Sequence, residues 1–142
     1  MILLDVNVLV YAHRQDMPGH ERIGPWLEKV ANGSAPFGLS TLVLSGMLRV
    51  ITHPRVFATP TPTDTALEFI EALRARPNCV EVQPGPRHWG IFTNLCNATR
   101  ATGNRVPDAY LAALAIESGS EWVTTDRGFS RFAGLRWRHP LG

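Results

Sequence analysis

The stretch that decides the fold is Met1-Ile-Leu-Leu-Asp5-Val-Asn7-Val-Leu-Val-Tyr11, the first eleven residues of the chain. Residues 2–4 form a short apolar run without helical spacing, which is typical of a strand buried on both faces. Asp5 interrupts the apolar tract, and a buried carboxylate needs solvent, a cation or a hydrogen-bonding partner. At the carboxyl end of a parallel strand, Asp5 can belong to a ligand site or can cap a following helix. This stretch alone leaves both interpretations open.

Length and composition predict one ordinary globular domain spanning residues 1–142. The chain is 44% hydrophobic and 18% charged, and a chain of this length buries about two thirds of its unfolded surface. No apolar run approaches the roughly 20 residues that span a bilayer, and the N-terminus lacks a signal peptide's basic region. We therefore expect a cytoplasmic protein without a membrane partner. Cys79 and Cys96 form no metal-binding or disulfide pattern, so we expect reduced thiols.

The charge of the chain is a weak indicator of its partner. The net charge of +2 is too small to indicate nucleic-acid binding by itself. Thirteen of the fourteen basic residues are arginine, which binds phosphate through a bidentate fork. A GC-rich genome would produce the same bias, so arginine usage adds only slight support for a phosphate-bearing ligand.

Apolar periodicity and turn residues predict strands alternating with helices. Strands are predicted at residues 2–4, 79–82, 121–125 and 135–138, and helices at 23–30, 42–51, 65–73, 89–96 and 106–116. In the helix at 65–73, Thr65 and Glu68 have capping-box spacing, and Leu67, Ile70 and Leu73 form the predicted inner stripe. The order β-α-α-α-β-α-α-β-β predicts an α/β fold with a small parallel β-sheet sandwiched by α-helices.

Three aspartates stand where this fold would bring them together. Asp5 and Asp126 follow apolar strands, and Asp108 lies in the first turn of an apolar helix, after Pro107. If the two strands are parallel neighbours, all three carboxylates reach one edge of the sheet. At ~4 Å and an effective dielectric of ~20, each pair repels by about 4 kcal/mol, so protons or a cation must intervene. Oxygen ligands without nearby His or Cys favour Mg²⁺ or Mn²⁺, which suits phosphodiester hydrolysis.

Each of these residues also has a structural interpretation. Asp108 is favourable in a first helical turn through the helix dipole, and Asp126 could begin an Asp-Arg-Gly turn. Asn7 could form an Asx turn or orient a ligand, and Asn104 most simply caps the helix that carries Asp108. Thr124 suits a strand by propensity alone, although its hydroxyl could orient Asp126. No single residue decides between these interpretations.

Three motifs in order along the chain nevertheless resemble one family. The segments are Asp5-Val-Asn7-Val-Leu, Arg105-Val-Pro-Asp108-Ala-Tyr-Leu-Ala-Ala-Leu-Ala and Thr124-Thr-Asp126-Arg-Gly-Phe129. They are similar to the acidic motifs of PIN-domain ribonucleases, and more narrowly of the VapC toxins. Residues 48–57, Leu-Arg-Val-Ile-Thr-His-Pro-Arg-Val-Phe, resemble a segment of the mycobacterial VapC subgroup. The likeness runs nearly from end to end.

The resemblance implies an Mg²⁺- or Mn²⁺-dependent endoribonuclease that cuts cellular RNA, with transfer or ribosomal RNA as the expected target. It implies a homodimer inhibited by a VapB-like antitoxin whose C-terminal tail crosses the active-site groove. Asp5, Asp108 and Asp126 would hold the metal and carry catalysis. Asn7, Asn104 and Thr124 would orient those carboxylates. Arg49, Arg105 and Arg127 are candidates for contacts with RNA phosphates, because each lies within or beside a motif.

The chain departs from the family pattern at two acidic positions. Gly46 stands where many members carry a Glu, and Gly128 stands where a second acid often follows Asp126. Glu117 is a poor substitute, because it lies about 13 Å along the helix from Asp108 and about half a turn round. These differences weaken the expectation of a second metal ion and leave a three-aspartate site that can hold one.

Two other functions agree with parts of the sequence. A haloacid-dehalogenase-like phosphatase also begins with an Asp after an apolar strand, but it needs a second Asp where this chain has Asn7. A catalytically degenerate PIN-like module that binds RNA or an antitoxin without cutting would agree with Gly46 and Gly128. A nuclease assay with divalent ions or EDTA separates these alternatives.

Overall fold

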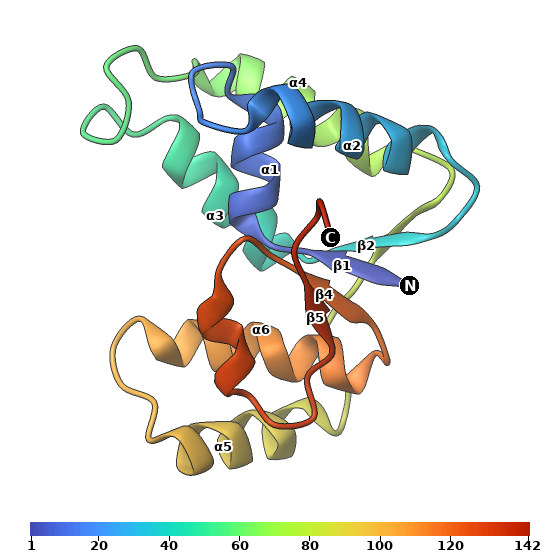
Figure 1. The fold of residues 1–142 in the computed structure, drawn as a ribbon, viewed down its shortest axis with the longest axis vertical. Coiled ribbons are helices and arrows are strands. Elements are labelled where there is room, and N and C mark those ends of the chain that lie inside the picture. The colour runs from blue at the N-terminus through green and yellow to red at the C-terminus, as the bar shows by residue number, and fades with distance from the viewer.

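The computed structural model describes all 142 residues and places a parallel sheet between two groups of helices (Figure 1). The strands are β1 (Ile2–Leu4), β2 (Phe37–Leu39), β3 (Cys79–Glu81), β4 (Glu121–Val123) and β5 (Trp137–Arg138). The α-helices are α1 (Val6–His13), α2 (His20–Asn32), α3 (Thr41–Ile51), α4 (Thr63–Arg74), α5 (His88–Thr99) and α6 (Arg105–Glu117). A 3₁₀ helix, η1 (Arg127–Arg131), follows β4.

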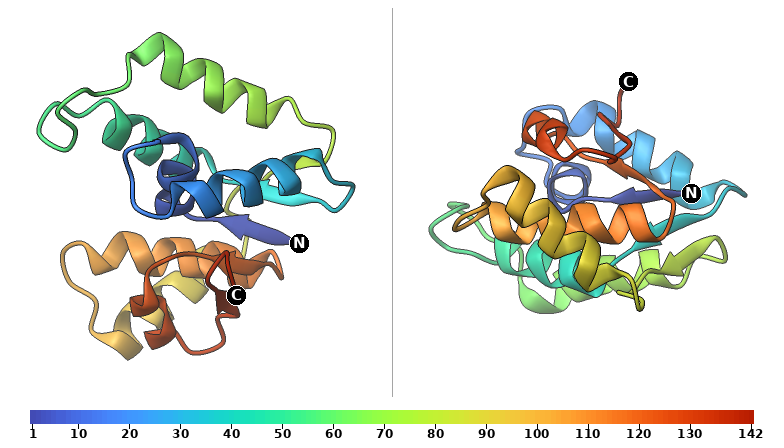
Figure 2. Two further views of the ribbon diagram at one scale, coloured as in Figure 1. Left: turned by 45° about the horizontal axis from the view of Figure 1, so that its top comes forward. Right: turned by 90° about the horizontal axis from the view of Figure 1, so that it is seen from below.

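The topology of the sheet creates a crevice beside β1. The strand order is β3-β2-β1-β4-β5, and every neighbouring pair is parallel. The chain moves outward from β1 to β3, then crosses to the other side of β1 for β4. Right-handed crossovers therefore place α1–α4 on one face and α5 and α6 on the other, as Figures 1 and 2 show. The predicted α/β sandwich is confirmed, and the carboxyl ends of β1 and β4 flank the point where the winding reverses.

Three elements were not predicted from the sequence: helix α1, strand β2 and the 3₁₀ helix η1. Helix α1 buries Val8, Leu9, Val10 and Ala12, so its sequence is apolar nearly all round and lacks an amphipathic period. Strand β2 has only three residues with a glycine, Gly38, in the middle. A Cβ atom at Gly38 would lie 2.9 Å from Val82 Cγ2 and 3.0 Å from Leu3 Cδ1, so the residue type is set by close packing between strands.

The prediction for α4 was wrong at its start and on its buried face. The helix begins at Thr63 with Pro62 as N-cap, so Thr65 and Glu68 do not form a capping box. Leu67 is 41% exposed, whereas Ala66, Ile70 and Leu73 are buried. These three residues have spacings of four and three, so they share one helical face. Ala66 therefore takes the buried position that was predicted for Leu67, and a small alanine gives only a weak hydrophobic signal in the sequence.

The core lies on both faces of the central strands. Leu3, Leu4, Trp122 and Val123 are completely buried, as expected for parallel strands covered on both sides. Helix α6 adds four buried alanines at 109, 112, 113 and 115, whose small side chains allow close packing. Both cysteines are free, and none of the helices is both long and apolar enough to cross a bilayer.

Candidate active site

Asp5 both caps α1 and belongs to a polar network at the carboxyl end of β1. Its Oδ1 accepts a hydrogen bond from the Val6 amide at 2.7 Å. Its Oδ2 accepts one from the Thr124 hydroxyl at 2.7 Å and one from Asn7 Nδ2 at 3.1 Å. The residue is only 6% exposed. The two interpretations of Asp5 are therefore compatible, because the capping geometry leaves the second oxygen facing Thr124.

Thr124 joins the ends of β1 and β4. It is completely buried, and its Oγ1 also accepts hydrogen bonds from the Asp126 amide at 3.0 Å and from Asn7 Nδ2 at 3.1 Å. One donated and two accepted bonds use the full capacity of a hydroxyl. Asn7 completes the link, since its Oδ1 accepts a bond from the Thr125 amide at 3.0 Å. The network positions Asp5 and the backbone of Asp126 relative to each other.

All three predicted aspartates line one open cavity of about 760 Å³. Asp5 comes from the end of β1, Asp126 from the end of β4, and Asp108 from the first turn of α6. Asp126 Oδ1 accepts a hydrogen bond from the Gly128 amide at 2.7 Å, so its other oxygen remains available. The N-terminal half of α3 forms the opposite wall, with Leu42, Ser45 and Gly46.

The carboxylates of this cavity influence one another. Burial raises the pKa of Asp5 to about 6, against the lowering effect of hydrogen bonds from Thr124 and Val6, and the charges of Asp108 and Asp126 raise it further. Burial also raises the pKa of Asp108, and the charge of Asp126 adds to the rise. The positive charges of Arg131 and Arg105 oppose it. The cavity therefore concentrates negative charge that a cation or protons must balance.

Of the other predicted site residues, some line the cavity of the aspartates and one lies outside it. Asn104 lines the cavity and is the N-cap residue of α6, but its side chain makes no capping hydrogen bond. Arg49 also lines the cavity. Arg105 lies close enough to Asp108 to affect its pKa, whereas Arg127 lies outside this cavity and lines another.

Arg131 is a neighbour of the carboxylates that the sequence did not indicate. Its Nη1 lies 3.9 Å from Asp108 Oδ2, with the side chains 26% and 30% exposed. Arg131 follows Asp126 by five residues, and only the 3₁₀ geometry of η1 brings its side chain back toward Asp108. No pattern in residues 126–131 of the sequence indicates this placement, which depends on the 3₁₀ turn.

Gly46 and Gly128, the two positions where an acid was expected from the resemblance, each have close neighbours. A Cβ atom at Gly46 would lie 3.0 Å from Val6 Cγ2. A Cβ atom at Gly128 would lie 2.8 Å from Arg131 Nη2 and 2.9 Å from Asp126 Oδ1. A side chain at position 46 would therefore need a small shift of Val6, and one at position 128 would need Arg131 and Asp126 to move.

Glu117 lies outside the cavity, as its position along the helix predicts. It accepts hydrogen bonds from the Gly85 amide at 2.7 Å and the Arg87 amide at 2.9 Å. Partial burial tends to raise the pKa of Glu117, but these two amide bonds outweigh it and the net pKa is lowered. The residue therefore fastens the loop before α5 to the end of α6.

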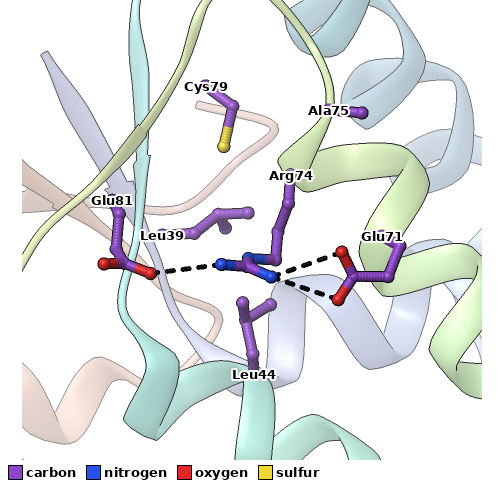
Figure 3. Close-up of a pocket in the computed structure, with 7 residues that line it drawn as sticks. All are labelled: Leu39, Leu44, Glu71, Arg74, Ala75, Cys79 and Glu81. Carbon is purple, nitrogen blue, oxygen red and sulfur yellow. Dashed lines mark hydrogen bonds and ion pairs between the residues drawn. The ribbon is translucent and has the colours of Figure 1, made fainter.

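A separate cavity of about 380 Å³ lies at the β3 edge of the sheet (Figure 3). There Arg74 lies between two glutamates, with Nη1 3.1 Å from Glu71 Oε1 and Nη2 3.4 Å from Glu81 Oε1. The half-buried Cys79 lines the same cavity, and burial raises the pKa of its thiol. Both glutamates are paired with Arg74, which offsets one of their two charges, and the thiol is held protonated, so this cavity has no activated nucleophile.

Comparison with known proteins indicates the family to which this chain belongs. A family model described as "PIN domain" matches residues 2–135. Ribonuclease VapC43 of Mycobacterium tuberculosis is 48% identical over 141 residues, covering 99% of this chain and 96% of its own. Ribonuclease VapC25 of the same species is 41% identical over 140 residues, covering 99% of both chains.

Solved structures with lower identity share the fold. VapBC2 from Rickettsia felis, bound to a promoter DNA fragment, matches with a TM-score of 0.69 and 18% identity over 98% of both chains. FitAcB from Neisseria gonorrhoeae matches with a TM-score of 0.66 and 20% identity over 99% of both chains. The family model and the full-length relatives together show that this chain belongs to the PIN domain family.

Proposed function

We propose that this protein is a metal-dependent endoribonuclease and the toxin of a type II toxin–antitoxin pair, acting on cytoplasmic transfer or ribosomal RNA. Relatives that are 41% and 48% identical over the full chain are named ribonucleases. The observation that carries the proposal is the single cavity lined by Asp5, Asp108 and Asp126. These side chains come from β1, α6 and β4, and they meet where the winding of the sheet reverses.

The donor set of this cavity fits Mg²⁺ or Mn²⁺. The acidic side chains offer hard carboxylate oxygens, and no His or Cys lines the cavity. No three His, Cys, Asp or Glu side chains are close enough to hold an ion by themselves. Mg²⁺ commonly keeps several water molecules and binds through one or two carboxylates. Asp5, Asp108 and Asp126 would therefore hold the ion partly through water.

In the mechanism we propose, residues of the chain orient the Asp5 carboxylate and accept a proton from the attacking water. A bound divalent ion would stabilise negative charge on the attacked phosphate and promote ionisation of water. The Thr124 hydroxyl and the Asn7 amide fix the orientation of the Asp5 carboxylate. The free oxygen of Asp126 is exposed to the cavity and is suited to accept a proton from the attacking water. As in the family resemblance, the products would carry 5′-phosphate and 3′-hydroxyl ends.

Three arginines are suited to bind the RNA backbone at this site. Arg49 lines the cavity, Arg105 lies at the start of α6, and Arg131 lies 3.9 Å from Asp108. Arg131 occupies the space beside Gly128 that an acid would need. Its guanidinium would supply, next to a single metal ion, positive charge that stabilises the transition state.

Two protein partners follow from the same proposal. Solved neighbours include the toxin–antitoxin complexes VapBC2 of Rickettsia felis and VapBC of Salmonella typhimurium. We infer a VapB-like antitoxin whose C-terminal tail covers the cavity, and a homodimer of this chain. Co-expression with the small gene adjacent to this one, followed by size-exclusion chromatography, tests both partners.

The decisive experiment is cleavage of total cellular RNA, with the 5′ ends mapped. Wild-type protein with Mg²⁺ or Mn²⁺ should cut at discrete positions, and EDTA should abolish cutting. Asp108→Asn should lower the rate by at least about a hundredfold, because it removes a carboxylate from the site without changing its volume. Asp64→Asn, on the exposed first turn of α4, is the matched control and should cut like wild type.

The alternative of a non-cutting module is motivated by Gly46 and Gly128. It predicts that wild type leaves every RNA intact with either ion while still binding RNA or an antitoxin. Cutting that persists in EDTA, or in Asp108→Asn at the wild-type rate, would also contradict the proposal.

A further inference from the structure

A second, strongly basic cavity lies on the other side of η1 from the aspartates. It has a volume of about 680 Å³ and is lined by eight residues: Arg22 from α2, Arg127 and Ser130 from η1, Trp137, Arg138 and His139 from β5 and its end, and Leu141 and Gly142 after them. Arg138 Nε is paired with Glu121 at 2.8 Å. Arg22 and Arg127 are exposed and take part in none of the ion pairs of the structure. Arg22 and Arg127 thus line this cavity without an ion-pair partner, in a lining that also includes Gly142, the last residue of the sequence.

The 3₁₀ geometry of η1 connects this basic cavity to the active site. Residues three apart lie above one another in a 3₁₀ helix, so residues 126–131 present three faces. Asp126 and Phe129 line the aspartate cavity, whereas Arg127 and Ser130 line the basic cavity. Gly128 and Arg131 form the third face, where Arg131 reaches Asp108. One short element therefore forms a wall of both cavities and fixes their separation.

The side chains of the basic cavity suit a phosphate carried on a nucleotide. The arginine forks donate pairs of hydrogen bonds to phosphate oxygens, and Ser130 adds a hydroxyl donor. His139 Nδ1 accepts a bond from the Leu141 amide at 3.1 Å, so its Nε2 carries a proton and is a further donor. Trp137 is half-buried in the lining and offers an aromatic surface to a base or sugar.

We propose that this cavity binds a backbone phosphate of single-stranded RNA, outside the active site, and holds the strand that continues across η1 into the aspartate cavity. The inference rests on the proposed function, since it assigns a second contact with the same substrate. The carboxylates of an acidic peptide would pair with the arginines equally well, but such a peptide has no base to stack on the aromatic surface beside them. The shared wall with the aspartate cavity also favours a polymer that enters both.

The test is binding of a fluorescein-labelled ten-nucleotide oligouridylate in EDTA, where cutting does not interfere. Arg22→Ala and Arg127→Ala should each weaken binding several-fold, and the double variant by about tenfold or more, measured by fluorescence anisotropy. The slope of log affinity against log salt should fall by about 0.7 for each phosphate that an arginine no longer neutralises. Arg74→Ala is the matched control, because it removes the same charge beside β3, at the opposite edge of the sheet from β5.

The outcomes separate this inference from the proposed function. If the double variant binds the oligonucleotide with the affinity and salt slope of Arg74→Ala, the phosphate site is refuted even when wild type cuts RNA. If wild type does not cut RNA but the double variant loses binding, the nuclease proposal fails and the phosphate site stands. A double variant that loses binding of a ten-residue oligoglutamate peptide, yet keeps oligonucleotide binding, would reassign the cavity to an acidic peptide and overturn the inference. Circular dichroism verifies that each variant is folded.

Discussion

At the scale of single residues, the site depends on the hydrogen bonds that one buried threonine makes to two aspartates. Thr124 donates a hydrogen bond to the Asp5 carboxylate and accepts one from the backbone amide of Asp126. One hydroxyl therefore joins the Asp5 side chain to the segment that carries Asp126. The sequence placed all of these residues in motifs, but Thr124 looked equally suited to a strand by propensity. Only its burial and its three hydrogen bonds distinguish the two roles.

The raised pKa of Asp5 predicts a pH dependence of stability in EDTA. Burial raises this pKa from 3.8 to about 6, so the native state favours the protonated carboxyl. The resulting stabilisation is complete below pH 3.8 and is lost as the pH rises through about 6, and it amounts to at most about 3 kcal/mol. Asp5→Asn cannot ionise, so at pH 7.5 it should unfold at a higher urea concentration than wild type.

The measurement is urea unfolding of both proteins at several pH values between 4.5 and 7.5. The difference in free energy of unfolding between variant and wild type should grow with pH by about 1 to 3 kcal/mol, on top of a constant offset from the altered bond with Thr124. Parallel pH curves for the two proteins would contradict the assigned burial of the charge.

At the scale of elements, strand β2 shows how far local sequence signals reach. Strand β2 lies between β1 and β3 and pairs through Phe37, Gly38 and Leu39. Glycine in a strand normally weakens it, which is why this strand escaped prediction. Close contact from Val82 and Leu3 requires the missing side chain, and that contact joins residues that are distant in the sequence.

Gly38→Ala should therefore destabilise the protein by about 1 to 3 kcal/mol through overpacking. Gly90→Ala makes the same chemical change in α5, where nothing lies within 4 Å of the new Cβ, and should stabilise by up to about 1 kcal/mol. Urea unfolding measures both. Combining Gly38→Ala with Val82→Ala should recover part of the loss, and an equal loss in both backgrounds would refute the assigned contact.

At the scale of the whole molecule, chain topology rather than any motif assembles the site. The winding reverses between β1 and β4, so Asp5 and Asp126, 121 residues apart in the chain, emerge side by side. The return helix α6 begins at the same edge and adds Asp108. Helices α1, α3 and α6 all begin at this edge, and their dipoles place partial positive charge around the carboxylates. The fold thereby offsets part of the repulsion that it creates.

A divalent ion that binds this native cavity should stabilise the whole fold. Mg²⁺ at a hundred times its dissociation constant should add about 2.7 kcal/mol, since the unfolded chain has no such site. The measurement is the shift in thermal midpoint with Mg²⁺ concentration. Asp126→Asn should weaken the response strongly, and Arg131→Ala should strengthen it, because Arg131 places a competing positive charge beside Asp108. An unchanged response in Asp126→Asn would refute binding at this cavity.

The sequence by itself determined the α/β alternation, the parallel sheet and the three aspartates, because hydrophobic periodicity and turn residues act over a few neighbouring positions. It did not reveal α1, because apolar residues lie nearly all round this helix and leave no amphipathic period. It also did not reveal β2, because the glycine in this strand is required by neighbours that are distant in the sequence. Only the tertiary structure decided that Arg131 rather than Arg127 lies beside Asp108, that Arg127 lines a second cavity, and that Thr124 bonds both the Asp5 carboxylate and the Asp126 backbone amide. These assignments depend on distances between residues far apart in the chain, and such distances exist only once the sheet has formed.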